Sequence, residues 1–222
     1  GALRFLGFSV IGLAIVATAV LACPRRWHLA LSGALGLWML VAFGIGPSAA
    51  TLFLLGSALA TGDLLVGSYW EGRFEPLTAV TLSLLVGITA WVWLIGFLAH
   101  IPVNTHSLYV VMFSVPLTLG WRRVWLHLGR LRGWLTEPAP ATLAIKASSG
   151  LLVFVLALHV VNVAMPEHTG DGLVSHLRVG TELAYFYRWL FDFHGFVGAV
   201  WPMGADWAYG AAYLLGGEIA AK

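Results

Sequence analysis

The sequence predicts an all-α, polytopic transmembrane helical bundle. Hydrophobic residues make up 59% of the 222-residue chain and charged residues only 10%, whereas roughly a quarter of the residues in an ordinary soluble domain are charged. A chain so poor in charge cannot cover a globular surface with polar groups, so lipid is its expected solvent. The 26 Gly and 11 Trp also suit close helix packing and anchoring at membrane–water interfaces.

Six apolar runs are candidates to cross the bilayer. A spanning helix needs about 17–25 mostly apolar residues, because each residue rises about 1.5 Å through a hydrocarbon core of about 30 Å. Strand-like alternation is absent, so helices are the expected spanning structure. The fifth run is short and is interrupted by Pro116. The predicted spans are 5–23, 29–46, 48–66, 77–99, 106–121 and 143–164.

These runs divide the chain into three predicted regions. They are a six-span region (1–164), an external loop with amphipathic helices (165–204) and the truncated start of a seventh transmembrane helix (205–222). A tight hairpin is expected at Gly46-Pro47, between the second and third spans. Because the chain begins with Gly1 and stops at Lys222 within a predicted helix, we expect a piece of a longer protein.

Arginine residues fall in alternate connections. Short loops rich in Lys and Arg stay on the cytoplasmic side of a membrane, and loops 46–48 and 100–105 contain neither residue. The pattern predicts that the N-terminus and residues 165–204 lie outside, as in a bacterial inner-membrane protein. The arginines that set this orientation are Arg25, Arg26, Arg73, Arg122, Arg123, Arg130 and Arg132.

Residues 121–135 place Trp and Arg side chains at helical spacing. This pattern is typical of an interfacial amphipathic helix that attracts anionic lipid headgroups. A phosphate-binding patch is the alternative interpretation. Glu137, Pro138 and Pro140 are expected to end this helix before the sixth span.

Ionisable residues gather among aromatic ones between residues 165 and 203. Carboxylates at a membrane surface can bind a divalent cation or act as a general base, and His can also orient a phosphate. Simple solvation in a water-facing loop is the alternative for most of them. The group comprises Glu167, His168, Asp171, His176, Glu182, Asp192 and His194. Thr181–Phe196 is predicted as an aromatic helix lying on the bilayer, and Asp206 as the cap of the helix that follows.

Two motifs in this region resemble those of multispanning glycosyltransferases of the GT-C superfamily, the bacterial type that depends on polyprenyl-phosphate sugars. In many members a segment Pro-x-x-x-x-Asp-Ala-Leu-x-Tyr-His-Leu opens the first external loop, and residues 166–177 follow this order with Gly172 in place of Ala and Ser175 in place of the aromatic residue. Trp201-Pro-Met-Gly matches the turn into the next span. The resemblance covers residues 166–222, and here the loop follows the sixth span instead of the first.

The resemblance implies roles for four residues. Asp171 would be the catalytic base that deprotonates an acceptor hydroxyl, or a ligand of a divalent ion (Mg²⁺ or Mn²⁺) that neutralises the donor phosphate. His176 would contact the donor or its phosphate, with Glu167 and His168 as further candidates. The implied partners are the lipid bilayer and a polyprenyl-phosphate sugar donor.

A second class of function stays open. The chain can instead be a non-catalytic accessory or scaffold subunit of a larger photosynthetic or respiratory membrane complex. No nucleic-acid partner is expected. Asp63 is interpreted as a buried, hydrogen-bonded or interfacial carboxylate, with an ion or proton path as the alternative. The other polar residues near the spans are His28, His100, His159 and Asn162. We expect their side chains to be hydrogen-bonded or to lie at the membrane interface, with haem or chlorophyll ligation as the alternative for the three histidines.

Overall fold

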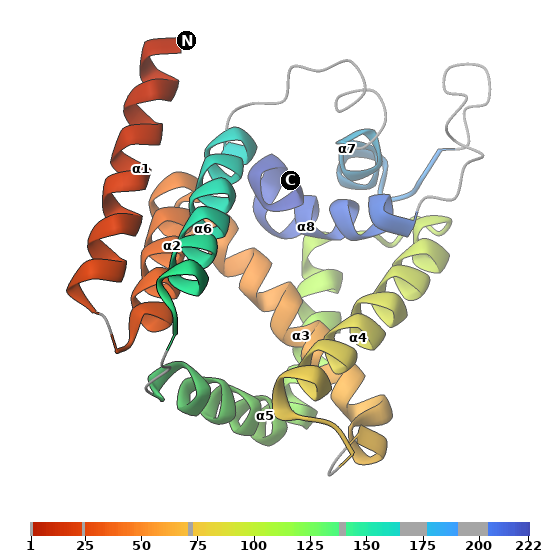
Figure 1. The fold of residues 1–222 in the computed structure, drawn as a ribbon. Helices are drawn as coiled ribbons and strands as arrows, with labels where there is room; N and C mark the ends of the chain where they lie inside the picture. The colour runs from red at the N-terminus through yellow and green to blue at the C-terminus, as the bar shows by residue number, and fades with distance from the viewer. Residues whose placement is uncertain (1, 24, 71–72, 138–140, 165–176, 191–203) are drawn as a thin grey trace. The chain divides into compact units, whose positions relative to one another are not determined.

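The computed structural model describes residues 2–23, 25–70, 73–137, 141–164, 177–190 and 204–222. Over these residues the chain forms eight helices and no strand (Figure 1), which confirms the predicted all-α class. Their bounds are α1 Ala2–Ala22, α2 Trp27–Phe43, α3 Ile45–Trp70, α4 Pro76–Ala99, α5 His106–Thr136, α6 Leu143–Ala164, α7 Leu177–Phe186 and α8 Gly204–Ala221.

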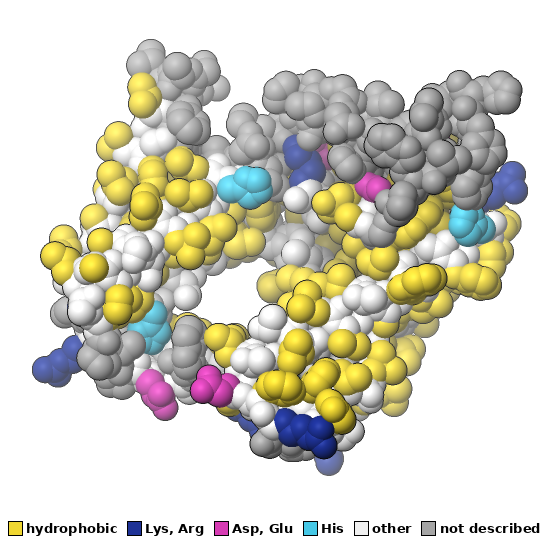
Figure 2. Space-filling model, turned by 45° about the vertical axis from the view of Figure 1, so that its right-hand side comes forward, with side chains coloured by type: hydrophobic (Ala, Val, Ile, Leu, Met, Phe, Trp, Pro, Cys, Tyr) yellow, Lys and Arg dark blue, Asp and Glu magenta, His cyan; other side chains and the backbone are white. Residues whose placement is uncertain are grey.

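Three of the described helices are long and apolar enough to cross a membrane. They are α3, α4 and the Leu143–Val160 part of α6. Shorter apolar helices cover Ser9–Ala22 and Trp27–Phe43. Hydrophobic side chains dominate the described surface seen in Figure 2, and on α4 the side chains of Trp93 and Phe97 are 77% and 69% exposed. Six spans and the start of a seventh stay a prediction.

Two helix boundaries differ from those expected around prolines. The break between α2 and α3 falls at Gly44, whose φ of 79° suits Gly, and not at Gly46-Pro47. Pro47 lies in the first turn of α3, where its missing N–H has no intrahelical partner to lose. Pro116 does not end the fifth helix either, since α5 runs through it for 31 residues. The basic segment 121–135 is therefore the second half of α5.

The helices of the C-terminal region also begin and end elsewhere than predicted. The helix expected over Thr181–Phe196 begins earlier, at Leu177, and ends at Phe186 because Tyr187 has a φ of +59°. Its expected last residues, 191–196, lie outside the described part. Asp206 does not cap α8 but lies in its first turn, where a carboxylate interacts favourably with the positive end of the helix dipole.

The described helices form two compact units: residues 1–45 with 130–165 (unit 1), and residues 46–129 with 166–222 (unit 2). In unit 1, α1, α2 and α6 pack together around Val16, Trp27 and Leu31. A polar contact ties two of these helices, because the indole N–H of Trp38 donates to the carbonyl of Ala157 at 3.0 Å. Unit 2 contains α3, α4, most of α5, α7 and α8.

A close crossing of α3 and α4 organises unit 2. A Cβ atom at Gly62 would meet the backbone carbonyl of Ser83, and one at Gly87 would meet that of Ala58. Each helix therefore offers two small residues four apart, the arrangement that lets membrane helices approach to backbone contact. Beyond the crossing, Trp91 packs edge-on against Phe113 of α5, with ring centroids 4.7 Å apart.

Substituting the crossing glycine tests this packing. We expect Gly62→Ala to lower the free energy of unfolding by about 1–3 kcal/mol, because its methyl group has no space beside the Ser83 carbonyl. Gly33→Ala in α2 is the matched control: a methyl group at Gly33 would have no neighbouring atom within 4 Å, and Ala favours a helix by about 0.5–1 kcal/mol. Thermal unfolding in detergent, followed by circular dichroism, measures both. Equal melting of Gly62→Ala and wild type would contradict the crossing.

Candidate functional site

α8 lies across one end of α3, α4 and α5 (Figure 1). A Cβ at Gly96, near the end of α4, would contact the indole of Trp207. His106 Nδ1, at the start of α5, lies 2.8 Å from the carbonyl oxygen of Leu214. Gly216 lies against Ala50, near the start of α3. α8 thus crosses three helix ends, and together with α7 and residues 187–190 it forms what we call the platform.

α7 packs on α8 through small residues. Gly210 of α8 lies against Val179 and Leu183, and Gly180 of α7 lies against the ring of Tyr213. Val179 and Leu183 are fully buried. The first residue of α7, Leu177, is buried beside Ala212. The platform is therefore a packed layer of two helices rather than a pair of independent surface helices.

Asn104, in the turn between α4 and α5, ties the platform to those helices. It is fully buried, and its Nδ2 lies 3.0, 2.9 and 2.7 Å from the carbonyl oxygens of Leu98, Ile101 and Tyr187. Its backbone N–H also donates to Tyr187 at 3.0 Å. Its Oδ1 accepts a hydrogen bond of 2.8 Å from the hydroxyl of Tyr109. One side chain thus joins the α4–α5 turn to the residue that ends α7.

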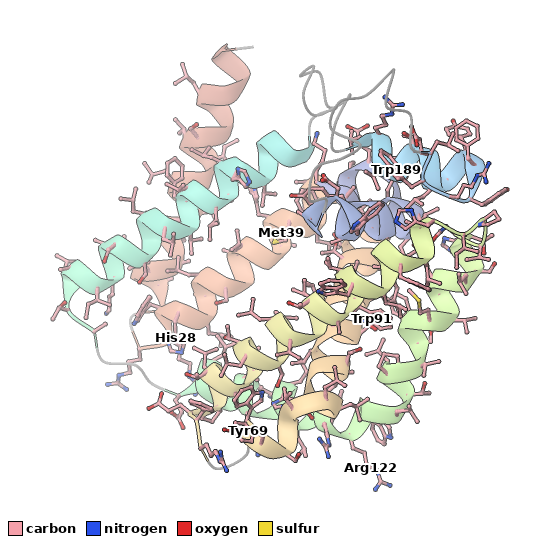
Figure 3. The ribbon with its side chains drawn as sticks, turned by 90° about the vertical axis from the view of Figure 1, so that its right-hand side faces the viewer. His28, Met39, Tyr69, Trp91, Arg122 and Trp189 are labelled. Carbon is pink, nitrogen blue, oxygen red and sulfur yellow. The ribbon has the colours of Figure 1, made fainter. Side chains whose placement is uncertain are left out.

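Two residues after Tyr187, Trp189 and Leu190, are held as well. The N–H of Trp189, which Figure 3 shows beside α7 and α8, donates to the carbonyl of Ala99 at 2.6 Å. The carboxylate of Glu182 accepts from the N–H of Leu190 at 3.0 Å and from Arg178 Nε at 2.7 Å. Glu182 is only 8% exposed, so this carboxylate is a buried structural acceptor rather than a solvated loop residue.

The residues that the sequence nominated for chemistry lie outside the described part of the chain: Glu167, His168, Asp171 and His176, as well as Asp192 and His194. The structure therefore does not test whether they come together. It does describe the residues next to them, Leu177 at the start of α7 and Leu190 after its end. Within the described residues no group of three His, Cys, Asp or Glu side chains can hold a metal ion, and the divalent ion stays an expectation.

A second polar cluster lies where α3 meets the second half of α5. Asp63 Oδ1 is 3.0 Å from His127 Nε2, and Arg123 Nη1 donates to the Asp63 carbonyl at 3.0 Å and to Oδ2 at 3.4 Å. Gly67, one turn after Asp63, leaves the space that its carboxylate fills. Asp63 is 6% exposed, which confirms the interpretation of a buried, hydrogen-bonded carboxylate.

Sequence reasoning missed both partners of Asp63. Arg123 and His127 are four residues apart and therefore share a helix face, but the sequence pattern of the whole segment indicated lipid headgroups instead. The sequence did contain a signal for this contact: an acidic residue within one apolar helix, and an Arg and a His four residues apart on another. Of the candidate histidines, His100 packs edge-on against Trp207, His28 lies edge-on to Trp27 and His159 is exposed.

Comparison with known proteins adds no relative. No protein-family model, no curated protein and no solved structure matches this chain. The likeness to GT-C glycosyltransferases therefore depends on the motif residues themselves.

Removing the Asn104 side chain tests how the platform is held. In Asn104→Ala, the buried Tyr109 hydroxyl loses its acceptor, at a cost of about 1–3 kcal/mol for a buried group left unpaired. The Tyr187 carbonyl loses its Nδ2 donor and keeps only the backbone N–H of residue 104. We expect faster amide hydrogen exchange at Trp189 and Leu190, measured by mass spectrometry in detergent. Ser107→Ala, at a nearby exposed residue, is the control and should leave exchange unchanged. Unaltered exchange in Asn104→Ala would contradict the role of Asn104 in holding the platform to the α4–α5 turn.

Proposed function

We propose that this chain belongs to a membrane glycosyltransferase that transfers a sugar from a polyprenyl-phosphate donor at the external face, with Asp171 as the general base. One observation carries the proposal. The first motif, residues 166–177, ends at the first residue of α7, and the second, residues 201–204, ends at the first residue of α8. Both motifs therefore lead directly into the platform, at one end of three packed helices.

A site at helix ends suits this chemistry. The polyprenyl chain of the donor stays in hydrocarbon, while its phosphate and sugar need the polar boundary. An acceptor hydroxyl is a poor nucleophile, so a carboxylate such as that of Asp171 takes its proton as the oxygen attacks the anomeric carbon. The bond between that carbon and the phosphate oxygen breaks, and polyprenyl phosphate leaves with the bonding electron pair. Asp171 is also the candidate ligand for Mg²⁺ or Mn²⁺, which when bound would neutralise the donor phosphate.

The distribution of charge within unit 2 supports an external platform. Asn104 and the loop 100–105, which has no Lys or Arg, lie at the platform end. Arg73, in the connection between α3 and α4, and Arg123, beside Asp63, lie toward the other end. Short connections rich in Arg stay on the cytoplasmic side. This asymmetry favours a platform on the side where polyprenyl-linked sugars would be consumed.

Asp171→Asn tests the proposal. Membranes containing the protein are incubated with radiolabelled polyprenyl-phosphate hexoses or pentoses, and the label that leaves the lipid extract is measured. We expect wild type to transfer label and Asp171→Asn to lower the rate by about 100-fold or more, the share that a general base contributes. Glu137→Gln, an exposed carboxylate-to-amide change outside the loop, is the control and should keep the wild-type rate.

Two results would contradict the proposal. One is transfer by Asp171→Asn at the wild-type rate, which would exclude Asp171 as the general base. The other is no transfer by wild type from any donor in the panel, which would favour the non-catalytic subunit.

A further inference from the structure

The Asp63 cluster has no part in the proposed transfer reaction, so it needs an explanation of its own. An ionisable residue in a membrane helix is costly and usually serves a function. Asp63 lies on α3, a candidate span, and its side chain is only 9% exposed. Its neighbours at this contact are two side chains of α5, and α4, which packs beside it, carries no charged or titratable residue.

Asp63 holds the guanidinium of Arg123 through a single nitrogen, Nη1. Nη1 lies against the carbonyl and Oδ2 of Asp63, while His127 Nε2 occupies Oδ1. Within the described part of the chain, Nε and Nη2 of Arg123 have no hydrogen-bond partner, and the side chain is 48% exposed. Arg123 is thus anchored at one nitrogen and presents its remaining donors outward.

A planar guanidinium with free donors is suited to a phosphate. Its fork of N–H groups matches two phosphate oxygens, which a point charge such as Lys cannot do. Arg122, the preceding residue, is exposed and projects from α5 (Figure 3). The segment 121–136 contains four Arg and no Asp or Glu. The carboxylate of Asp63 is already engaged by its two partners, so this surface favours an anion.

The neighbouring aromatic residues indicate that the anion is attached to lipid. Trp121 and Trp125 are 58% and 69% exposed on α5, in the same turns of the helix as the two arginines. Trp rings prefer the headgroup level of a bilayer, where an apolar body and a polar N–H are both accommodated. A soluble phosphate has no apolar part for these rings to contact, whereas a phospholipid supplies both a phosphate and acyl chains.

We propose that Arg122 and Arg123 form a binding site for the phosphate of an anionic phospholipid, in which Asp63 is a positioning residue that holds Arg123 in its binding orientation. His127 occupies the other carboxylate oxygen and completes the anchor. The site is independent of glycosyl transfer, since it uses none of the motif residues.

Lipid binding to the purified protein tests the site. The protein in detergent is titrated with phosphatidylglycerol or phosphatidylcholine, and bound lipid is counted by native mass spectrometry. We expect Arg123→Gln to weaken phosphatidylglycerol binding about fivefold, the effect of one Arg near an anionic surface. Arg26→Gln, which removes an exposed Arg in the α1–α2 connection, is the matched control and should leave binding unchanged. Equal losses in the two variants would overturn the site in favour of non-specific charge.

Asp63→Asn separates positioning from charge. This variant removes a negative charge, so charge alone predicts tighter phosphatidylglycerol binding. It also weakens the side-chain contacts that residue 63 makes with Arg123 and His127 and leaves Arg123 its bond to the backbone carbonyl, so a positioning role predicts weaker binding. We expect weaker binding, and tighter binding would overturn the positioning role. If Asp63→Asn does not fold, Arg123→Lys replaces it: this variant keeps the charge but loses the planar fork, so the site predicts weakened binding and wild-type binding would overturn it.

Competition identifies the source of the phosphate. Millimolar inorganic phosphate should leave bound phosphatidylglycerol in place, because it cannot contact Trp121 and Trp125. Displacement by inorganic phosphate would overturn the lipid assignment, and equal binding of phosphatidylcholine would overturn the preference for an anionic lipid.

Discussion

The backbone contact between α3 and α4 at Gly62 and Gly87 is the constraint on which the rest of unit 2 depends. Lipid gives membrane helices no hydrophobic reason to associate, so close approach of small residues and a few polar contacts must hold them together. Because Gly62 faces α4, the next residue, Asp63, is turned toward α5. Further along α4, Trp91 and Ile95 enter the core that α5 and α8 complete.

Two buried polar residues then fix the two ends of this unit. Asn104 binds backbone carbonyls at the platform end, and Asp63 binds Arg123 and His127 toward the other. A polar group without a partner is expensive where no water is present, so each of these side chains specifies one arrangement of its neighbours. The platform is accordingly held by hydrogen bonds to backbone carbonyls, whereas the contact at the other end combines a hydrogen bond to the Asp63 backbone carbonyl with contacts to its carboxylate.

The sequence predicted the helices well and their ends poorly. Apolar runs reveal helices because burial in lipid demands them, and a helix lies over each of the six predicted ranges. Pro116 was expected to interrupt the fifth span, yet α5 continues through it for 31 residues, as a helix can when its neighbours compensate for the missing hydrogen bond. α7 ends at Phe186, just before Tyr187, whose carbonyl accepts from Asn104; this partner is distant in sequence and therefore left no local signal.

The candidate site was predictable only in part. Asp63 could be recognised as buried because it interrupts an apolar run, but its partners required knowing that α5 packs against α3. Asn104 stands in a short turn without periodicity, and only its spacing from Tyr109 could have suggested a contact. The motif around Asp171 could be read from the sequence alone, and its geometry lies outside the described residues.

The proposed function requires that unit 2 spans a membrane with its platform outside. Single cysteines at the two ends of α4–α5 test it most directly: Ser107→Cys beside the platform and Glu75→Cys at the start of α4, both exposed, in a Cys23→Ser background. A membrane-impermeant maleimide is applied to spheroplasts before and after permeabilisation. We expect the cysteine at position 107 to be labelled from outside and the one at position 75 to react only after permeabilisation. Labelling of both from outside, or the reverse pattern, would contradict it.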